Sequence, residues 1–336
     1  MRDVGITQWD QSNLDMLDQL FVVDAASQAV DDPFGPPPSP SWLQLTLAGG
    51  KGTDRREVWV ATDNSGSVLG WYWLRLPDRE NRHVGFLSLS VHPEHRRHGI
   101  GTALLRHAAQ RAAADGRTAL GGETFEGGSG DAFAKRIGAK PGVLEARRRL
   151  DITALPPGKV AALRAEADTA ASGYSLASWT GPVPEERVPG YAYVREAMND
   201  APSDYEDQRW DTQRVRDVVN PRIERSVNQR YTIVAIHDAT GQTAAFTEID
   251  VAPDVPGWAY QDNTGVARPH RGHRLGLLLK VAMLQWLATA EPGVGKIITW
   301  NAAINDHMIA INEQLGFEVF HPWVQDYEIP VAAVLR

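Results

Sequence analysis

The stretch that decides the fold occurs twice in the chain, as HRRHGIGTALL at residues 95–105 and as HRGHRLGLLLK at residues 270–280. Each copy is a basic turn with glycine, followed by apolar residues at helical spacing. The first N–H groups of a helix have no partner within it, and the helix dipole favours an anion there, so each copy predicts a phosphate site. The equivalent Arg96 and Arg271 lie 175 residues apart in a chain of 336, which indicates a duplicated domain.

The elements around the two turns follow the same order. In the first half we expect strands at 57–62, 68–76 and 84–91, a helix at 98–114, a strand at 118–124, a helix at 131–137 and a closing strand at 143–152. In the second half we expect strands at 231–237, 243–251 and 258–266, a helix at 274–288, a strand at 296–301, a helix at 306–315 and a closing strand at 317–329. Antiparallel hairpins before a single crossover helix predict a mixed α/β (α+β) fold. The expected domains are 1–152 and 159–336, joined by a linker at 153–158.

The composition narrows the classes of function. The apolar fraction of 43% and the charged fraction of 23% are ordinary for a globular protein. No apolar run is long enough for a transmembrane helix, no apolar leader is visible and there is no cysteine, so we expect a cytoplasmic protein without a membrane partner or a thiol nucleophile. Residues 1–150 hold 18 basic and 18 acidic side chains and the remainder 16 and 24, so the net charge of −8 belongs to the second half and argues against a nucleic-acid partner. The histidines lack ligand spacing, so no metal site is predicted.

The first turn and its surroundings resemble the GNAT superfamily of acyl-CoA-dependent N-acyltransferases. The family signature Arg/Gln-x-x-Gly-x-Gly/Ala is met by Arg96, Gly99 and Gly101. The resemblance implies two tandem GNAT-like domains, similar to those of the mycothiol synthase group, each with a mostly antiparallel sheet, one parallel splayed strand pair and flanking helices. It also implies acetyl-CoA as acyl donor, with its acyl arm beside the backbone of Ser90 and Val91. Its phosphates would lie over Arg96, Arg97, His98, Gly99, Ile100, Gly101 and Thr102.

The second copy departs from this signature. Arg271 and Gly276 match, but Arg274 stands where the first glycine is expected and Gly272 is displaced. Either the turn is reshaped, with Arg274 reaching a phosphate, or this copy binds CoA weakly. The donor-binding residues that the resemblance implies here are Gly265, Val266, Arg271, Gly272, His273, Arg274, Leu275 and Gly276.

A second family motif lies downstream of the second turn. Asn305 matches the family asparagine, which would hold the pantetheine arm, while Asn301 and Asn312 would shape the same cleft. Asn312 stands where the family often has a tyrosine that protonates the leaving thiolate. In the first copy Gly127 and Ala134 take the places of Asn305 and Asn312.

Amide formation also needs a group that removes a proton from the amine. The candidates in the second copy are Asp262, which we favour, and Glu248 or Asp250; Glu123 is the candidate in the first. Tyr260 and Tyr327 are candidates for the missing acid. The acidic segment 200–211 would draw a protonated amine towards the cleft.

The leading hypothesis is therefore an acetyl-CoA-dependent N-acetyltransferase that acts on a small primary amine, such as an aminosugar or another specialised metabolite, by direct transfer in a ternary complex. The alternative is a catalytically degenerate acyl-CoA-binding sensor or scaffold. In either case we expect a monomer or a homodimer.

Overall fold

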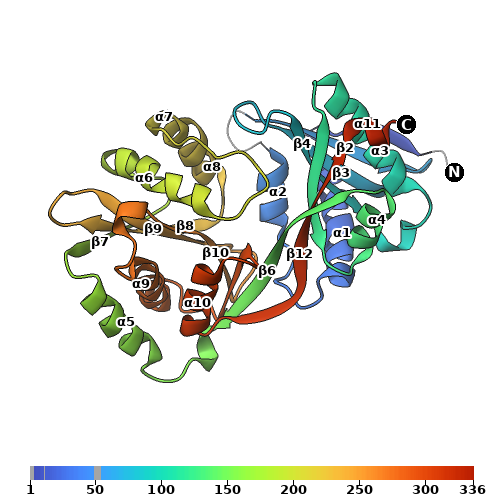
Figure 1. Ribbon diagram of the computed structural model, residues 1–336. Helices are drawn as coiled ribbons and strands as arrows, with labels where there is room; N and C mark the ends of the chain where they lie inside the picture. The colour runs from blue at the N-terminus through green and yellow to red at the C-terminus, as the bar shows by residue number, and fades with distance from the viewer. Residues whose placement is uncertain (1–3, 11, 49–53) are drawn as a thin grey trace. The chain divides into compact units, whose positions relative to one another are not determined.

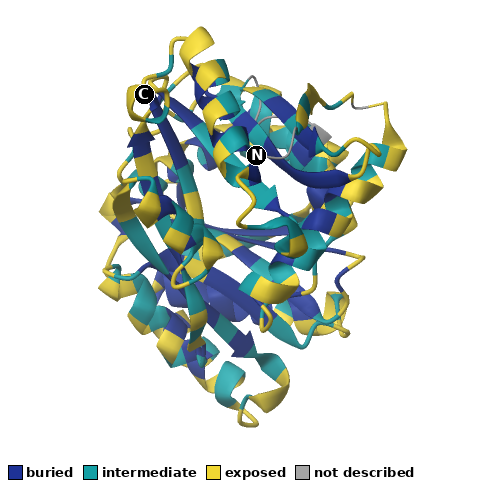
Figure 2. Ribbon diagram, turned by 90° about the vertical axis from the view of Figure 1, so that its right-hand side faces the viewer, coloured by how far each residue is buried: buried dark blue, intermediate teal, exposed yellow. Residues whose placement is uncertain are grey.

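The computed structural model describes residues 4–10, 12–48 and 54–336, and the chain forms two compact units (Figure 1). Unit 1 holds the residues up to Leu144 together with Asp204–Glu206 and Pro322–Arg336. Unit 2 holds Glu145–Ser203 and Asp207–His321. In both units the buried residues concentrate on the strands and on the helix sides that cover them (Figure 2).

Unit 1 has a sheet with helices on both faces. Its strands are β1 (Gly5–Gln8), β2 (Arg55–Thr62), β3 (Val68–Leu76), β4 (Val84–Val91), β5 (Ala119–Phe125) and β12 (Glu318–Pro330), hydrogen-bonded in that order. Its helices are α1 (Leu14–Asp31), α2 (Pro40–Ala48), α3 (Ile100–Ala114), α4 (Ser129–Arg136) and α11 (Val331–Val334). Helices α1 and α2 pack on one face around Leu20 and Trp71, and α3 packs on the other around Leu74 and Leu104.

Unit 2 repeats this plan. Its strands are β6 (Lys140–Asp151), β11 (Lys296–Ala302), β10 (Trp258–Val266), β9 (Thr243–Val251), β8 (Gln229–His237) and β7 (Tyr174–Thr180), hydrogen-bonded in that order. Its helical segments are α5 (Lys159–Ala170), α6 (Val188–Arg195), η4 (Glu196–Asp200), α7 (Thr212–Arg214), the π-helical η5 (Val215–Val219), α8 (Asn220–Arg225), α9 (Leu275–Ala290) and α10 (Asp306–Leu315). Helix α9 covers one face around Ile249 and Leu279, and α6 covers the other around Phe246.

The last strands of the two halves are exchanged. Strand β6, expected to close the first half, pairs antiparallel with β11 of unit 2, from Lys296 opposite Asp151 to Ala302 opposite Glu145. The C-terminal part of β12 pairs antiparallel with β5 of unit 1, from Val324 opposite Phe125 onwards. The compact units therefore do not follow the contiguous boundaries that we expected near residue 152. Apolar alternation identifies a strand, but it does not say which of two similar sheet edges the strand joins.

The expected fold class is confirmed. In each unit the neighbouring strands are antiparallel except for one parallel pair, β4 with β5 and β10 with β11. The helices expected at 98–114 and 274–288 are α3 and α9.

Candidate functional site

Each unit contains a parallel strand pair that opens into a V. In unit 1, β4 and β5 pair only from Val84 to Phe86, and in unit 2, β10 and β11 pair only from Trp258 to Tyr260. Beyond these pairs the described backbones of the two strands are no longer hydrogen-bonded to each other, and in unit 2 only the side chain of Thr299 still reaches across, where its Oγ1 donates to Gln261 O at 3.5 Å. An open edge presents backbone donors and acceptors that an extended ligand can use. The splayed pair implied by the family resemblance is thus present twice.

The first strand of the V differs between the two units. Strand β4 pairs with β3 in continuous register from Phe86 to Val91. In β10 the register shifts between Gln261, opposite Ile249, and Thr264, opposite Thr247, so three steps on β10 face two on β9. This extra residue is a β-bulge, which leaves backbone groups outside the ladder. The bulge contains Asp262 and lies where the V of unit 2 opens.

The basic turns have the same backbone conformation despite their different sequences. In unit 1, Arg97 and Gly99 have φ of 67° and 87°, and in unit 2 the equivalent Gly272 and Arg274 have φ of 88° and 54°. Arg274 therefore adopts the left-handed conformation that glycine has in the first copy, at some cost in strain. Of the two alternatives for the second copy, a reshaped turn or weak CoA binding, the backbone does not show the reshaped turn.

Both turns present the start of a helix without a side-chain cap. Gly99 and Arg274 are the N-cap residues of α3 and α9, and neither helix receives a hydrogen bond from an N-cap side chain. Ile100 and Leu275 are buried and anchor the helices in the cores. Around them His98, Thr102 and His273 are exposed, and Gly101 and Gly276 lie in the first turns. Each turn thus leaves first-turn N–H groups available to an anion.

The signature arginines hold the turns in place and do not point freely at a ligand. Arg96 Nε donates to Val91 O at 3.1 Å, and its guanidinium donates to Asp31 of α1 at 2.7 and 3.1 Å and to Ser27 Oγ at 3.1 Å. The Val91 carbonyl, expected beside the acyl arm, is therefore already an acceptor inside unit 1.

Unit 2 repeats this anchor. Arg271 Nε donates to Val266 O at 3.2 Å, and its guanidinium pairs with Asp200 at the end of η4. Arg274 pairs with Glu166 of α5, so its side chain has a partner within the protein. Gly265 lies beneath η4, where an added Cβ would come within 3.3 Å of Ala197.

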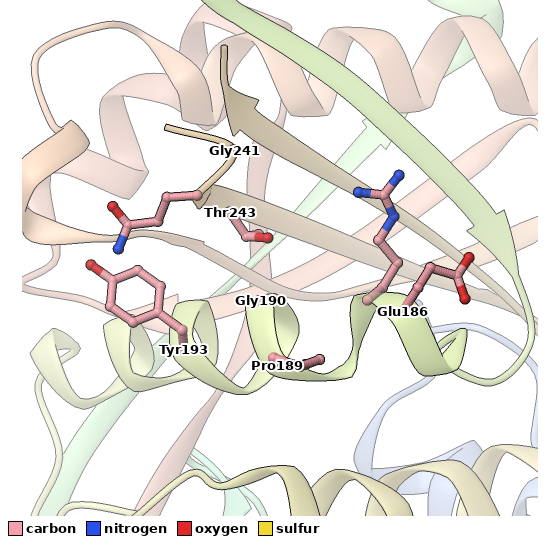
Figure 3. Close-up of a pocket in the computed structure, with 8 residues that line it drawn as sticks. Glu186, Pro189, Gly190, Tyr193, Gly241 and Thr243 are labelled. Carbon is pink, nitrogen blue, oxygen red and sulfur yellow. The ribbon is translucent and has the colours of Figure 1, made fainter. Parts of the chain in front are cut away.

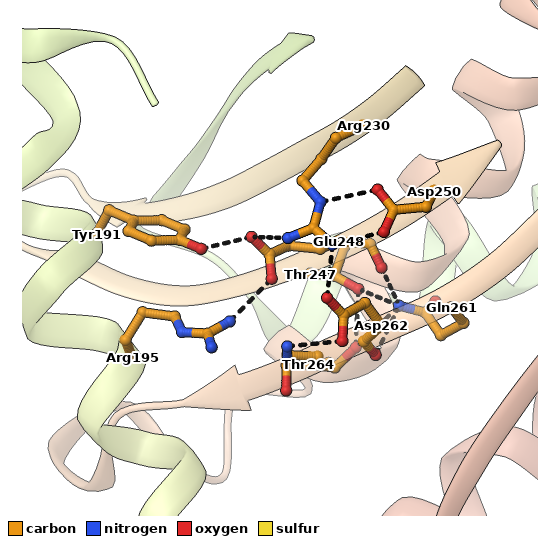
Figure 4. Close-up of polar contacts among 10 residues, drawn as sticks. Tyr191, Arg195, Arg230, Thr247, Glu248, Asp250, Gln261, Asp262 and Thr264 are labelled. Atoms are coloured by element: carbon orange, nitrogen blue, oxygen red, sulfur yellow. Dashed lines mark hydrogen bonds and ion pairs between the residues drawn. The ribbon is translucent and has the colours of Figure 1, made fainter. Parts of the chain in front are cut away.

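A network of ion pairs lies beside the bulge on the α6 face of unit 2 (Figure 4). Arg230 is its centre and donates to Asp250 at 2.5 and 2.8 Å and to Asp262 Oδ2 at 2.7 Å, and its Nη1 lies 3.5 Å from Glu248 Oε1. Burial opposes the charge of Arg230, but these three carboxylates raise its pKa well above the ordinary value. The network holds the three carboxylates in position.

The three carboxylates are not equally accessible. Glu248 is 1% exposed; its Oε1 accepts from Tyr191 at 2.5 Å and its Oε2 accepts from Arg195 at 2.9 Å. The side chain of Asp262 is 38% exposed, and its Oδ1 accepts from Asn263 Nδ2 at 2.8 Å. Asp250 is 7% exposed, so Asp262 is the most accessible of the three candidate bases of the second copy.

The remaining predicted residues of unit 2 lie in three places: in the closed part of the V, at the start of α10 and on the α9 side of the sheet. Tyr260 lies in the closed part of the V, opposite Ile298, and burial followed by Asp254 raises its pKa to about 12. Asn305 is the N-cap of α10, where its side chain accepts from Met308 N, so it stabilises a helix start. Asn301 and Asn312 are buried and hydrogen-bonded to each other at 3.4 Å on the α9 side of the sheet.

Unit 1 contains one carboxylate, Asp326, that sequence reasoning missed. Asp326 of β12 lies opposite Glu123 of β5, and burial, with the charges of Glu123 and Asp204, raises the pKa of Asp326 to about 6. Tyr205 packs against Phe86, with ring centroids 4.9 Å apart. No sequence signal pointed to Asp326 because its strand was assigned to the other half of the chain.

Tyr327, a candidate acid, lies in unit 1 and not in unit 2. Its hydroxyl donates to the buried Asp131 at 2.5 Å, and burial followed by this hydrogen bond raises its pKa to about 12. Two acidic side chains of the segment 200–211 bind backbone N–H groups of the protein. Asp204 accepts from Val143 N, and Asp211 caps α7.

A pocket of about 390 Å³ lies between α6 and the turn from β8 to β9 (Figure 3). Its lining includes Arg187, Tyr193 and Gln242, and none of the residues predicted for the site lines it. Within the described ranges the structure holds no group of three or more His, Cys, Asp or Glu side chains that could bind a metal ion. None of the described helices is both long and apolar enough to cross a membrane.

Comparisons with known proteins agree with this geometry. Residues 22–127 match the model of the acetyltransferase (GNAT) family. A solved tandem GNAT protein from the clavulanic acid biosynthesis pathway, without AcCoA, shares 28% identity with a TM-score of 0.81, and the match covers 98% of this chain and 99% of that one. No curated protein matches the sequence.

Two other solved structures share the fold. A GCN5-related N-acetyltransferase from Sphaerobacter thermophilus is 15% identical with a TM-score of 0.67, over 98% of this chain and 96% of that one. A glucosamine N-acetyltransferase region of a fungal multi-domain β-N-acetylglucosaminidase is 14% identical with the same TM-score, over 98% of this chain and 38% of that one. With its two splayed V-shaped pairs and two uncapped turns, this chain has a tandem GNAT architecture, and its residues 22–127 match the acetyltransferase (GNAT) family.

Proposed function

We propose that this protein is an acetyl-CoA-dependent N-acetyltransferase that transfers an acetyl group directly to a small primary amine. The observation that carries the proposal is the repeated V that ends at an uncapped, left-handed turn. A strand edge without a partner and a helix start without a cap are what an extended thioester with a pyrophosphate requires at its two ends. A protein that bound no such ligand would gain nothing from keeping both features in both copies.

The residues present fit such a donor. In unit 1 an added Cβ on Gly101 would meet only Val91 at 3.8 Å and Phe133 at 3.9 Å, which are ordinary contacts. The protein itself therefore does not require a glycine at this position, whereas a phosphate held close to the backbone does. The turn from Arg96 to Thr102 would hold the pyrophosphate in unit 1, and the turn from Arg271 to Gly276 would do so in unit 2. Acetyl-CoA supplies an activated acyl group at either site.

We place the acyl transfer itself in unit 2, because its V has the bulge. Backbone N–H groups outside the ladder can donate to a carbonyl oxygen on which negative charge develops. Asp262 lies in the bulge with one oxygen held by Arg230, so its carboxylate attracts a protonated amine and accepts the proton, directly or through a water. Glu248 has a positioning role here, since both of its oxygens accept hydrogen bonds inside the protein.

The acceptor that we propose is an amine of specialised metabolism, including aminosugars. The support is the 28% identity over nearly the whole chain to a protein of the clavulanic acid biosynthesis pathway. Asp262 is the exposed carboxylate of the network around Arg230 and would be the group that contacts a cationic substrate.

The test is release of thiol from acetyl-CoA in the presence of a panel of small primary amines, with the products identified by mass spectrometry. We expect an acetylated amine and matching thiol release. Acyl-CoA binding without thiol release from any amine would support the alternative, an acyl-CoA sensor or scaffold.

A matched pair of variants assigns the unit that performs the chemistry. Arg96→Ala and Arg271→Ala each remove the arginine that anchors one turn. Loss of turnover only in Arg271→Ala agrees with the proposal. Loss only in Arg96→Ala places the chemistry in unit 1, where Asp326 and Glu123 are the carboxylates nearest the V.

A further inference from the structure

Unit 2 buries a lysine without a counter-ion. Lys280 of α9 is 3% exposed, and its Nζ donates to Asn312 Oδ1 of α10 at 2.8 Å. Nζ also lies 5.5 Å from the centroid of the Phe317 ring. Among the residues that the structure describes, no carboxylate pairs with it. Removing an ammonium group from water is costly unless a partner compensates, and burial lowers the pKa of Lys280 to about 7.

The lysine belongs to a buried polar chain that reaches the V. Asn312 Nδ2 donates to Asn301 Oδ1 at 3.4 Å, and Arg148 Nη1 donates to the same oxygen at 3.1 Å. Arg148 is 4% exposed, and its Nε has no hydrogen-bond partner. Asn301 lies on β11 beyond the last residue that pairs with β10. Two buried cations are thus linked through two side-chain amides, a set that favours an anion beside it.

The chain lies directly below the turn that would hold the pyrophosphate. Gly276 and Lys280 are four residues apart on α9, so they share one side of the helix. This side faces α10, because an added Cβ on Gly276 would meet Ile311 at 3.1 Å. Asn312 stands where the family resemblance places a tyrosine that protonates the leaving thiolate, and Lys280 donates to this asparagine.

Unit 1 has no such chain, although its backbone is the same. Alignment of the turns and of the strand registers places Leu105, Ala134 and Thr124 opposite Lys280, Asn312 and Asn301. Leu105 and Ala134 are buried apolar residues. The fold therefore accepts a leucine at the position of Lys280, and the lysine is not needed for packing.

From these contacts we infer that Lys280, held by Asn312, donates the proton to the departing thiolate in unit 2. The inference rests on the proposed function. As the C–N bond forms and the C–S bond of the thioester breaks, the sulfur takes a proton from Nζ, which becomes a neutral amine and regains its proton from solvent. The amine substrate loses its own proton to Asp262.

Several charged groups on the elements around α9 have partners elsewhere. On α5, Glu166 pairs with Arg274 and Arg164 pairs with Asp168, and Glu291, the C-cap of α9, accepts from Tyr231. Glu313 of α10 acts on Arg148, whose pKa is lowered by burial. On β9, Glu248 and Asp250 are bound in the network on the α6 face.

The experiment compares the parent protein with Lys280→Leu, which introduces the residue of unit 1, and Lys280→Arg, which keeps a charge that does not leave at neutral pH. Lys140→Leu is the control, since Lys140 is exposed. We expect both Lys280 variants to lose about 100-fold in turnover. The parent should lose rate at alkaline pH, this loss should be absent in Lys280→Leu, and the control should match the parent. A Lys280→Leu protein with the parent's turnover and pH profile would overturn the inference while leaving the proposed function intact.

A second readout does not depend on turnover. The Nζ signal of Lys280 in lysine-labelled full-length protein is titrated by NMR with and without CoA. A bound thiolate stabilises the ammonium form, so the pKa of Lys280 should rise when CoA is added. If the parent released no thiol with any amine, the proposed function would fail and the inference with it. If the parent released thiol and the pKa of Lys280 did not move with CoA, the inference alone would fail.

Discussion

Replacing Lys280 by methionine should stabilise unit 2 in a pH-dependent way. Burial lowers the pKa of Lys280 from 10.5 to about 7 in the folded protein. Each pKa unit corresponds to about 1.4 kcal/mol, so the buried ammonium reduces stability by roughly 5 kcal/mol at or below pH 7. Methionine has a similar length and no charge. It leaves Asn312 Oδ1 without its donor, which costs about 1–3 kcal/mol. The expected net gain at pH 7 is therefore about 2–4 kcal/mol.

The sign of the pH dependence follows from proton binding. Between pH 7 and 10.5 the unfolded chain binds more protons at Lys280 than the folded chain, so the stability of the parent rises with pH across this window. The advantage of Lys280→Met should thus be largest at pH 7 and below. Above about pH 10.5 only the lost hydrogen bond to Asn312 remains, so the variant should be less stable than the parent by about 1–3 kcal/mol. Hydrogen exchange of amides in α9 and β9 measures the stability of unit 2 separately. A variant less stable than the parent at pH 7, or a difference that does not change with pH, would refute the account of an uncompensated buried charge.

Three further outcomes are expected. Gly101→Ala should keep the fold, because the new Cβ meets only ordinary contacts, but should weaken CoA binding at unit 1 by about tenfold or more in calorimetry; equal affinity would remove the turn from the donor site. Asp262→Asn should lower turnover and abolish the rise in rate on the acid side of the pH profile, whereas superimposable profiles would exclude this carboxylate. Asp326→Asn should stabilise unit 1 above about pH 6, because the raised pKa of Asp326 means that its ionisation opposes folding. The stability of unit 1 should change little below about pH 4. Hydrogen exchange of β5 amides measures this, and a variant stabilised below about pH 4 but not above about pH 6 would contradict the cause assigned to that pKa.

The repeated turn was the part of the fold most open to prediction from sequence. Glycines, basic residues and helical spacing at 95–105 and 270–280 determine local structure over a few residues, and local rules suffice there. The sequence left two alternatives open at Arg274, because a non-glycine residue adopts φ of 54° there, which sequence patterns disfavour and do not forbid.

The pairing partners of the two closing strands could not be predicted from the sequence, for a different reason. Residues 143–152 and 317–329 read clearly as strands, but the choice of partner depends on contacts far apart in sequence. That choice moved Tyr327 and Asp326 into unit 1 and Arg148 into unit 2. The roles of Arg96 and Arg271 were missed similarly, because their partners Asp31 and Asp200 lie 65 and 71 residues away.

Lys280 shows most clearly what could not be predicted from the sequence. It ends the second quoted stretch, and in the sequence it reads as an ordinary polar residue of a helix. Only the packing of α9 against α10 and β11 shows that it is buried beside Asn312 and lacks a counter-ion.

The central claim is that this tandem GNAT protein acetylates an amine in unit 2. The most direct test follows acetyl transfer to the best amine of the panel by mass spectrometry, with the parent, Arg96→Ala and Arg271→Ala measured side by side. The account predicts an acetylated amine from the parent and from Arg96→Ala, and little or none from Arg271→Ala. Acetylation by Arg271→Ala at the parent's rate, or no acetylated product from the parent with any amine, would contradict it.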